Sequence, residues 1–366
     1  MIDPHVHLRD GAQQAKETLR HGLRVAYQAG LDGVFEMPNT DPPLVSREAL
    51  LRRIEAADAA MRAEGIEIFH GVYGGLTREP KQIEEMVASC KELFPRVVGL
   101  KMFAGHSTGN MGITGVASQG LVYRTLSRLG YVGVLAVHCE KEKMLKPETW
   151  DPRRPESHSS ARPPAAEVAS VDDQMSLARA ARFAGTLHVC HISTPWALDV
   201  LRGTHQREAA EATSSGRTEA GTATARPRLT CGLTPHHALL DAGVQERSDG
   251  VLWKVNPPLR PVPIPAVMLR RLLDGDIDWI ETDHAPHTRE DKLRGHASGL
   301  PVLPFYPRFI ELLRRKGIGA ELLVRITHDS ICRTFGLSIR NTGRAPDRDL
   351  AHEYPWDPFA GADPGR

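Results

Sequence analysis

The sequence predicts an α/β protein, a (β/α)8 barrel of the TIM type, and three observations carry this prediction. Eight short apolar segments with strand composition recur along the chain, mostly separated by segments with helix composition. Several strand-like segments end in histidine, lysine or aspartate, as expected where the carboxyl ends of barrel strands gather polar side chains at one rim. The 366 residues, 41% hydrophobic and 25% charged, are enough for one large core.

The expected elements follow one another in a regular order. Strands are expected at residues 1–8, 31–37, 66–73, 97–102, 132–137, 186–191, 228–232 and 276–283. Helices are expected at 16–30, 46–64, 79–94, after the glycine-rich loop 105–115, and at 165–184, 263–273, 304–316 and 320–335, with Ser46 as an N-cap. Parallel strands joined by such crossover helices close naturally into a barrel.

Residues 1–339 are expected to form the barrel, and two segments break its pattern. Residues 203–227 are polar and small, so they cannot bury enough apolar surface to offset the entropy of ordering. They are predicted to be a mobile surface insertion, and no function is assigned to it. Residues 340–366 are rich in Pro, Asp and Gly and are predicted to be an irregular C-terminal tail that wraps the surface.

Charge, cysteine usage and hydropathy exclude several classes of protein. The 46 lysines and arginines nearly balance the 45 aspartates and glutamates, so nucleic acid is not an expected partner. The five cysteines are scattered without a C-x-x-C motif, which indicates reduced thiols and a cytoplasmic protein. No signal peptide is recognised, and no apolar run approaches the roughly 20 residues that span a bilayer, so no membrane partner is expected.

The first strand carries two histidines, His5 and His7, two residues apart. Side chains so spaced on a strand point to the same face, and both imidazoles can reach one zinc ion. An isolated H-x-H motif is equally consistent with two polar side chains at the end of a strand.

Lys101 ends the fourth strand-like segment. A protonated lysine, with an ordinary pKa of about 10.4, has no lone pair for a metal. At the end of a buried strand and beside two cations, its neutral amine could capture carbon dioxide and become a carbamate whose two oxygens bridge two metal ions. The alternative is a salt-bridged or snorkelling lysine, and only the other candidate ligands favour the carbamate.

His138, His191 and Asp283 end three further strand-like segments. Taken alone, each histidine is more often a hydrogen-bonded side chain than a metal ligand. Together with His5, His7 and a bridging carboxylate, they satisfy two zinc ions about 3.5–4 Å apart that share a hydroxide. Asp283 would then be a ligand and also the group that accepts the proton of the water and passes it to a leaving nitrogen.

Other polar residues beside these positions are not expected to be ligands. Cys139 and Cys190 adjoin histidines in the sequence, but neighbouring residues on a strand face opposite ways. Four nearby histidines are expected to fix loops or to orient the ligands: His188, His236, His237 and His284.

Eight motifs occur in order along the chain. They are D-x-H-x-H-L-R at 3–9, M-P-N-T at 37–40, G-L-K at 99–101, V-H-C-E at 137–140, C-H-I at 190–192, T-P-H-H at 234–237, N-P-P-L-R at 256–260 and D-H-A-P-H at 283–287. In their residues and their order these motifs resemble the amidohydrolase superfamily and, within it, the dihydroorotases. The resemblance extends from Asp3 to about Phe335.

The resemblance implies two Zn²⁺ ions per chain, bridged by a carboxylated lysine and a hydroxide. The implied metal ligands are His5, His7, Lys101, His138, His191 and Asp283. The implied substrate-binding residues are Arg9, Asn39 and His287, which would hold a carboxylate, with Asn256, Arg260 and Gly299 as further positions.

The resemblance also bears on the loop after Lys101 and on domain content. Ser107 and Thr108 fall where the family has a mobile lid, and the loop glycines give the backbone the freedom that closure needs. Many family members carry a small β-sandwich built from segments outside the barrel. Because His5 and His7 lie so close to Met1, no accessory β-sandwich is expected here.

The activity implied by the resemblance is zinc-dependent, reversible hydrolysis of (S)-dihydroorotate to N-carbamoyl-L-aspartate in pyrimidine biosynthesis. An allantoinase or hydantoinase type of cyclic amidohydrolase is the alternative with the same ligands. A different class of function is a non-catalytic scaffold for aspartate transcarbamoylase. The presence of a suitable residue at all six ligand positions argues against this role. The implied partners are the small-molecule substrate and either a second copy of the chain or aspartate transcarbamoylase.

Overall fold

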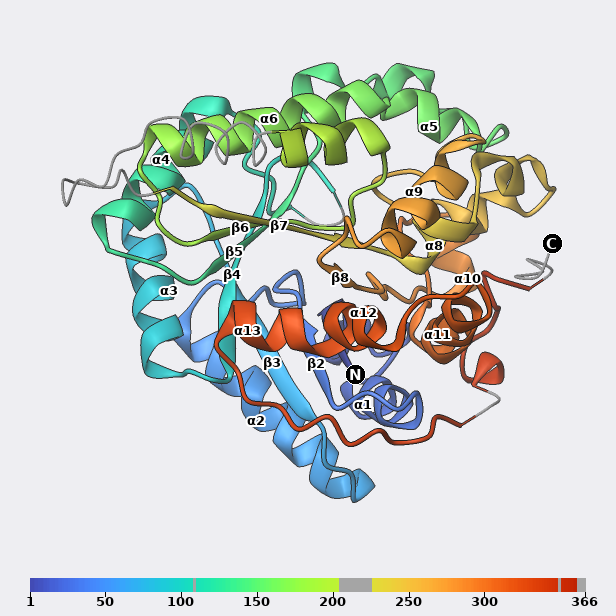
Figure 1. Ribbon diagram of the computed structural model, residues 1–366, viewed down its shortest axis with the longest axis horizontal. Coiled ribbons are helices and arrows are strands. Elements are labelled where there is room, and N and C mark those ends of the chain that lie inside the picture. The colour runs from blue at the N-terminus through green and yellow to red at the C-terminus, as the bar shows by residue number, and fades with distance from the viewer. Residues whose placement is uncertain (108–109, 204–225, 348–349, 361–366) are drawn as a thin grey trace.

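The structure, a computed structural model, describes residues 1–107, 110–203, 226–347 and 350–360. Eight parallel strands, each paired with the next one along the chain, form a single sheet that curls into a barrel surrounded by helices (Figure 1). The predicted (β/α)8 architecture is therefore confirmed. The predicted insertion at 203–227 lies outside the described residues except at its two ends.

The strands occupy the eight expected positions with shifted ends. They are β1 (Ile2–Val6), β2 (Gly33–Glu36), β3 (Phe69–Gly75), β4 (Val97–Phe103), β5 (Val134–His138), β6 (Thr186–Val189), β7 (Arg228–Leu233) and β8 (Trp279–Ile280). Nearly every strand residue is buried, because the barrel interior covers one face of the sheet and helices cover the other.

Helices connect most of the strands. They are α1 (Leu19–Gln28), α2 (Arg47–Glu64), α3 (Pro80–Glu92), α4 (Val116–Arg128), α5 (Ser157–Ala161), α6 (Pro164–Ala180), α8 (Pro235–Leu239), α9 (Ile264–Leu273), α10 (Arg289–Leu293), α11 (Tyr306–Arg315), α12 (Ala320–Val324) and α13 (Ser330–Phe335), with a further helix at 195–203. Ser46 caps α2 as predicted, since its side chain accepts a hydrogen bond from the backbone N–H of Ala49.

The last predicted helix is interrupted. Residues 320–335 form α12 and α13 with a π-helical turn at Arg325–Asp329 between them. The hydroxyl of Thr327 donates to the backbone carbonyl of Leu323 at 2.7 Å. A side chain that bonds back to a carbonyl four residues earlier competes with the helix ladder, and this contact lies where the helical pattern changes.

The barrel closes between β8 and β1 through side chains as well as backbone. The expected strand 276–283 is wrong in length, because only Trp279–Ile280 is a strand. Beyond it, the N–H of Thr282 donates to the Asp3 carboxylate at 3.1 Å, and the N–H of His7 donates to the carbonyl of His284 at 2.7 Å. Asp283 has φ +49°, so the chain turns there and the regular ladder ends.

Aromatic and aliphatic side chains fill the amino-terminal half of the barrel. Phe335 of α13 lies 5.0 Å from Phe35, 6.1 Å from Tyr73 and 5.9 Å from Trp279, measured between ring centroids. These contacts place an apolar floor below the opposite rim, where the strands end in polar residues.

The C-terminal segment packs against the barrel. After α13 the chain runs past α1, and the described residues 350–360 lie near α10 and α11 (Figure 1). The ring of Phe359 stacks on Phe305 with centroids 3.6 Å apart, and the hydroxyl of Tyr354 contacts Glu17 and His284 in the interior. Residues 340–347 are exposed or half-buried, whereas Leu350, Tyr354 and Phe359 in the segment 350–360 bury their side chains.

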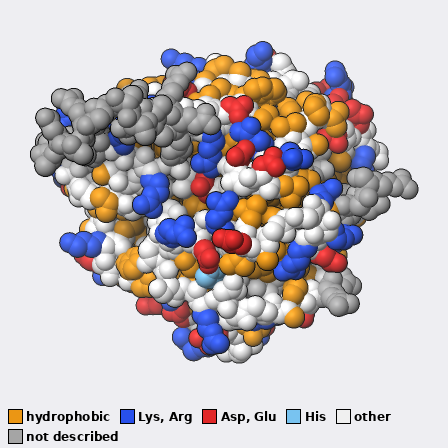
Figure 2. Space-filling model, viewed as in Figure 1, with side chains coloured by type: hydrophobic (Ala, Val, Ile, Leu, Met, Phe, Trp, Pro, Cys, Tyr) orange, Lys and Arg blue, Asp and Glu red, His pale blue; other side chains and the backbone are white. Residues whose placement is uncertain are grey.

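The molecular surface carries mixed charge. On the face shown in Figure 2, basic and acidic side chains are interspersed, as the formal net charge of +1 predicts. Among the described residues, no helix combines the length and the apolar composition needed to cross a bilayer.

Candidate active site

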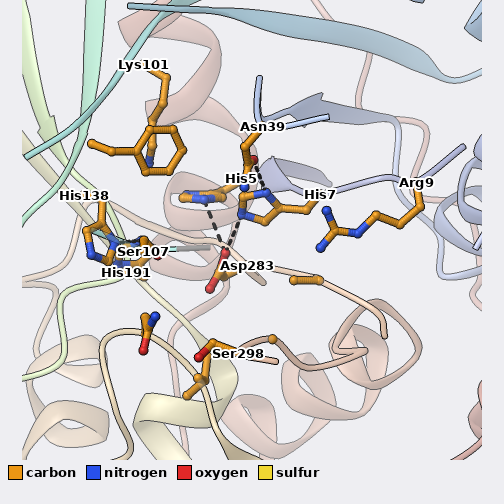
Figure 3. A pocket seen from close by; sticks show the side chains of 15 residues that line it. His5, His7, Arg9, Asn39, Lys101, Ser107, His138, His191, Asp283 and Ser298 are labelled. Atoms are coloured by element: carbon orange, nitrogen blue, oxygen red, sulfur yellow. Dashed lines mark hydrogen bonds and ion pairs between the residues drawn. The ribbon is translucent and has the colours of Figure 1, made fainter. Parts of the chain in front are cut away.

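A cavity opens at the carboxyl ends of the strands (Figure 3). Most of the predicted site residues line it: His5, His7, Arg9, Asn39, Lys101, Ser107, His138, His191, Asn256, Asp283 and Gly299. Phe103, Val255, Ala285 and Ser298 complete the lining. His287 and Arg260 lie outside this set, and Thr108 lies outside the described residues.

His5, His7 and Asp283 form a compact group of buried metal-ligating atoms, all within 4.8 Å of one another. Asp283 Oδ1 lies 2.9 Å from His7 Nε2 and 3.4 Å from His5 Nε2. Burial opposes ionisation of Asp283, but the hydrogen bond with His7 and the charge of His5 hold the pKa of this carboxyl well below its usual range. Burial lowers the pKa of His7 to about 4, which leaves its imidazole neutral near pH 7.

The contacts of His7 suit a cation. Its Nδ1 lies 2.6 Å from Asn39 Oδ1, and its Nε2 lies 2.9 Å from Asp283 Oδ1, so both ring nitrogens face acceptor oxygens. A neutral ring has one N–H and can donate to only one of these oxygens. With the proton on Nδ1, the Nε2 lone pair and the Asp283 carboxylate could bind one cation together. The group therefore fits a metal ion.

A second group is formed by His138 and His191. His138 Nε2 lies 2.9 Å from the Glu140 carboxylate, which Arg162 also binds through several hydrogen bonds. An ionised Glu140 accepts the Nε2 proton, so the lone pair of Nδ1 faces His191 Nε2, 3.2 Å away. Within the described part of the chain, buried Nδ1 of His191 has no hydrogen-bond partner.

Glu281 lies beneath both groups and was not identified from the sequence. Its carboxylate accepts hydrogen bonds from the backbone N–H of His191 and from the indole N–H of Trp279, and lies 3.0 Å from His188 Nε2 and 3.4 Å from His5 Nδ1. Glu281 is two residues before Asp283, so strand alternation could have placed both carboxylates on one face.

We expect Glu281→Gln to weaken metal binding by roughly 10–100-fold, because outer carboxylates of this kind orient histidine ligands. The neutral amide replaces the charge that faces His5 and presents N–H groups where the carboxylate accepted hydrogen bonds. Metal content after dialysis against graded chelator would measure the effect. Glu67→Gln, at an exposed position, is the control. Unchanged metal affinity in Glu281→Gln would contradict this role.

The expectation that Cys190 faces away from the ligands is wrong. Lys101 Nζ donates to Cys190 Sγ at 3.0 Å, and Cys190 groups with His5 and Glu281 as a candidate metal-ligating set. The alternation rule fails because β6 ends at Val189 and His191 has φ +36°, so consecutive side chains both turn inward.

Arg9 and His287 each have a buried nitrogen that finds no hydrogen-bond partner among the residues that the structure describes. These are Nε of Arg9 and Nδ1 of His287. The Nε2–H of His287 donates to the Ser298 carbonyl at 3.1 Å, so Nδ1 carries a lone pair in the neutral ring. Burial and the positive charge of Arg9 lower the pKa of His287 to about 2. A bound anion would favour protonation of Nδ1 and turn it into a donor.

Arg260 and Asn256 occupy different environments. Arg260 is buried, and its guanidinium donates to Ser193 Oγ at 3.0 Å and to the Arg162 carbonyl at 2.6 Å. Asn256 lines the cavity, and its Oδ1 lies 2.9 Å from His158 Nε2. In this structure Arg260 therefore supports the loops around the site.

The other histidines near the motifs are all buried. His237 lies 2.8 Å from Thr234 Oγ1 and 3.0 Å from the Pro257 carbonyl, which fixes its loop. His284 contacts Glu17 and accepts a hydrogen bond from the N–H of Leu303. Neither ring nitrogen of His236 has a hydrogen-bond partner among the described residues.

Comparison with known proteins identifies relatives along most of the chain, although no protein-family model matches it. The chain is 30% identical to the dihydroorotase of Halobacterium salinarum, covering 99% of this chain and 81% of that protein. It is 30% identical to the dihydroorotase of Methanothermobacter thermautotrophicus, covering 94% of this chain and 70% of that protein. The dihydroorotase of Methanosarcina mazei is 29% identical, with coverages of 99% and 79%.

Solved structures show the same fold at lower sequence identity. The L-hydantoinase (dihydropyrimidinase) of Arthrobacter aurescens superposes with a TM-score of 0.74 at 22% identity, covering 92% of this chain and 70% of that chain. A D-hydantoinase (dihydropyrimidinase) from Thermus sp. gives a TM-score of 0.71 at 22% identity, with the same coverages.

Proposed function

Since the chain belongs to the dihydroorotase family of cyclic amidohydrolases, we propose that it catalyses the reversible hydrolysis of dihydroorotate to N-carbamoyl-aspartate in pyrimidine biosynthesis. One observation supports this particular substrate in addition to the family membership. The cavity that gathers the six candidate ligands is also lined by Arg9 and Asn39, and His287 is hydrogen-bonded to the carbonyl of Ser298, which lines the same cavity. This arrangement supports a ring substrate with a carboxylate beside the scissile amide.

The donor set supports a pair of zinc ions. His5, His7 and Asp283 would hold one ion and His138 and His191 the other, with a carboxylated Lys101 between them. The fit rests on lone pairs that face each other and on buried ring nitrogens without partners. When bound, such ions lower the pKa of a water molecule and polarise a carbonyl group.

Asp283 is the proposed proton carrier. Its carboxylate is ionised, lines the cavity and lies against His7, so it can accept a proton from the attacking water. In the protonated form it can then deliver this proton to the ring nitrogen as the amide C–N bond breaks. In the reverse direction the same carboxyl group removes the proton from the ureido nitrogen.

The carboxylate of the substrate is assigned to Arg9, Asn39 and His287. A guanidinium and a protonated imidazole are charged donors, which bind carboxylates more strongly than neutral groups do. The neutral rings of hydantoin and allantoin lack this carboxylate, so these contacts favour dihydroorotate over both.

The relative kcat/KM values for dihydroorotate, hydantoin and allantoin test this function. We expect dihydroorotate to be preferred by at least about 10²-fold. The donors that bind its carboxylate would stay unpaired with a ring that lacks this group, which weakens binding of hydantoin and allantoin. Faster turnover of hydantoin or allantoin would reassign the substrate. A metal-loaded protein without activity on any of the three would favour the scaffold role.

We further propose that the enzyme acts in the cytoplasm, as a homodimer or with aspartate transcarbamoylase. All five cysteines are free thiols, which supports a reducing compartment. Light scattering of the purified protein, alone and mixed with the transcarbamoylase, distinguishes the two assemblies.

A further inference from the structure

Lys292 is a buried lysine that the proposed mechanism does not use. It lies on the short helix α10, and its side chain is fully excluded from solvent. Its Nζ lies 2.8 Å from each of three backbone carbonyl oxygens, those of Lys254, Ala297 and Gly299. Only the ammonium form has three N–H donors, so this set of acceptors matches a positively charged group.

No ion pair joins Lys292 to a carboxylate in the part of the chain that the structure describes. Burial, and after it the positive charge of Lys254, lowers the pKa of Lys292 well below its usual range, whereas the three carbonyl acceptors favour the ammonium form. Burying a cation without a counter-ion is unfavourable, and here the carbonyl dipoles replace water. Without the ammonium, three buried carbonyls would lose a donor, so the cation and these backbone segments stabilise each other.

The three carbonyls belong to two segments that line the cavity. Residues 254–256 contribute Val255 and Asn256, and residues 297–299 contribute Ser298 and Gly299. The two segments are tied a second time, because Lys254 Nζ donates to the His296 carbonyl at 2.9 Å and to Ser298 Oγ at 3.1 Å. Lys292 and Lys254 thus form a lysine clasp across this wall.

The clasp fixes the direction of the backbone dipoles. The carbonyls of Ala297 and Gly299 accept from Lys292, and the carbonyl between them accepts from His287. Gly299 has φ +146°, and a Cβ there would lie 2.5 Å from the Ala285 carbonyl, so only glycine fits. The carbonyl oxygens of Ala297, Ser298 and Gly299 are thus held by buried donors and do not point at a bound anion.

We propose that Lys292 is a positioning residue that holds the carboxylate side of the cavity and, as a buried cation, strengthens its preference for an anionic ring substrate. The inference rests on the proposed function. Arg9, Lys292 and Lys16 are the basic groups whose charge acts on His287, on the side of the cavity proposed to bind the carboxylate. Lys292 acts by holding the segments 254–256 and 297–299 in place and by the electrostatic effect of its positive charge. It does not contact the reacting atoms.

The test compares Lys292→Met with the wild-type holoenzyme, using dihydroorotate and its neutral carboxamide. We expect KM for dihydroorotate to rise about tenfold while kcat and metal content stay within about twofold, because the hydrogen bonds of Lys292 go to backbone carbonyls and not to the candidate metal ligands. The inhibition constant of the carboxamide should change much less than KM, which reduces the discrimination between charged and neutral rings. Lys91→Met, at an exposed position on α3, is the control for the loss of one positive charge.

Equal weakening of both compounds, or a fall in kcat and metal content alone, would show that Lys292 serves only the fold and would overturn the proposal. If Lys292→Met does not fold, Lys254→Met takes its place in the test. We expect the same loss of discrimination between dihydroorotate and the carboxamide. Unchanged discrimination in Lys254→Met would contradict the role of the clasp. Failure of the wild-type enzyme to hydrolyse dihydroorotate would instead refute the proposed function, before any variant is compared.

Discussion

Replacing Asp283 with asparagine should lower kcat for dihydroorotate by roughly 10²–10⁴-fold, the usual contribution of a positioned general acid–base group. The amide has nearly the same shape as the carboxylate but neither accepts a proton nor carries the charge that faces His7 Nε2 at 2.9 Å. Because Asp283 is also a candidate ligand, metal content should fall as well. Steady-state kinetics combined with metal analysis measures both effects.

The fold should survive this substitution. Asp283 contributes to the barrel through its backbone turn at φ +49°, a conformation that asparagine tolerates well. Circular dichroism and thermal unfolding should therefore match the wild type. Asp274→Asn, at an exposed position after α9, is the control for the same change of side chain. A fully active Asp283→Asn enzyme would mean that another group carries the proton.

Replacing Lys101 with alanine should lower activity and metal affinity by more than roughly 10–100-fold, the usual loss when a residue that orients a metal ligand is changed. The larger loss is expected because Lys101 is proposed to bridge the two ions. Its side chain is fully buried and lines the cavity, so the substitution leaves a polar space beside His5 and Cys190. A short carboxylic acid such as acetate can enter this space and replace the lost carbamate oxygens. Activity and metal content should therefore recover in part as acetate is added.

A direct measurement of the carbamate completes this test. Wild-type enzyme prepared with ¹³C-bicarbonate should show a carbamate resonance that is missing from Lys101→Ala. Lys316→Ala, at an exposed position, should behave as the wild type in every respect. A wild-type protein that binds metal fully without any carbamate signal would contradict the assignment of Lys101.

The fold and the candidate ligands were predictable because each depends on local patterns. Apolar strand-like runs repeat with helical segments between them, and the polar residues that end them share one rim of any parallel barrel. This is why His5, His7, Lys101 and Asp283 could be grouped from the sequence although they lie far apart along it.

The supporting residues could not be predicted in the same way. Glu281 lies against His188, and Arg162 binds Glu140. These partners lie far away in the sequence, so a local sequence pattern does not identify them. Cys190 was misjudged because a strand was assumed to continue where it ends. In the sequence Lys292 is one of several charged residues in the segment 288–294. Only the folded loops bring three carbonyls to it.

The closure between β8 and β1 sets the order in which this protein can mature. Asp283 and His7 are separated by 276 residues, and Thr282 and Asp3 by 279. Contacts of such long range form late in folding, since the entropy of bringing distant segments together must be overcome first. In small zinc domains the ion drives folding because the chain is unfolded without it. Here the candidate ligands come together only when the barrel closes between β8 and β1, so we expect the chain to fold before it binds metal.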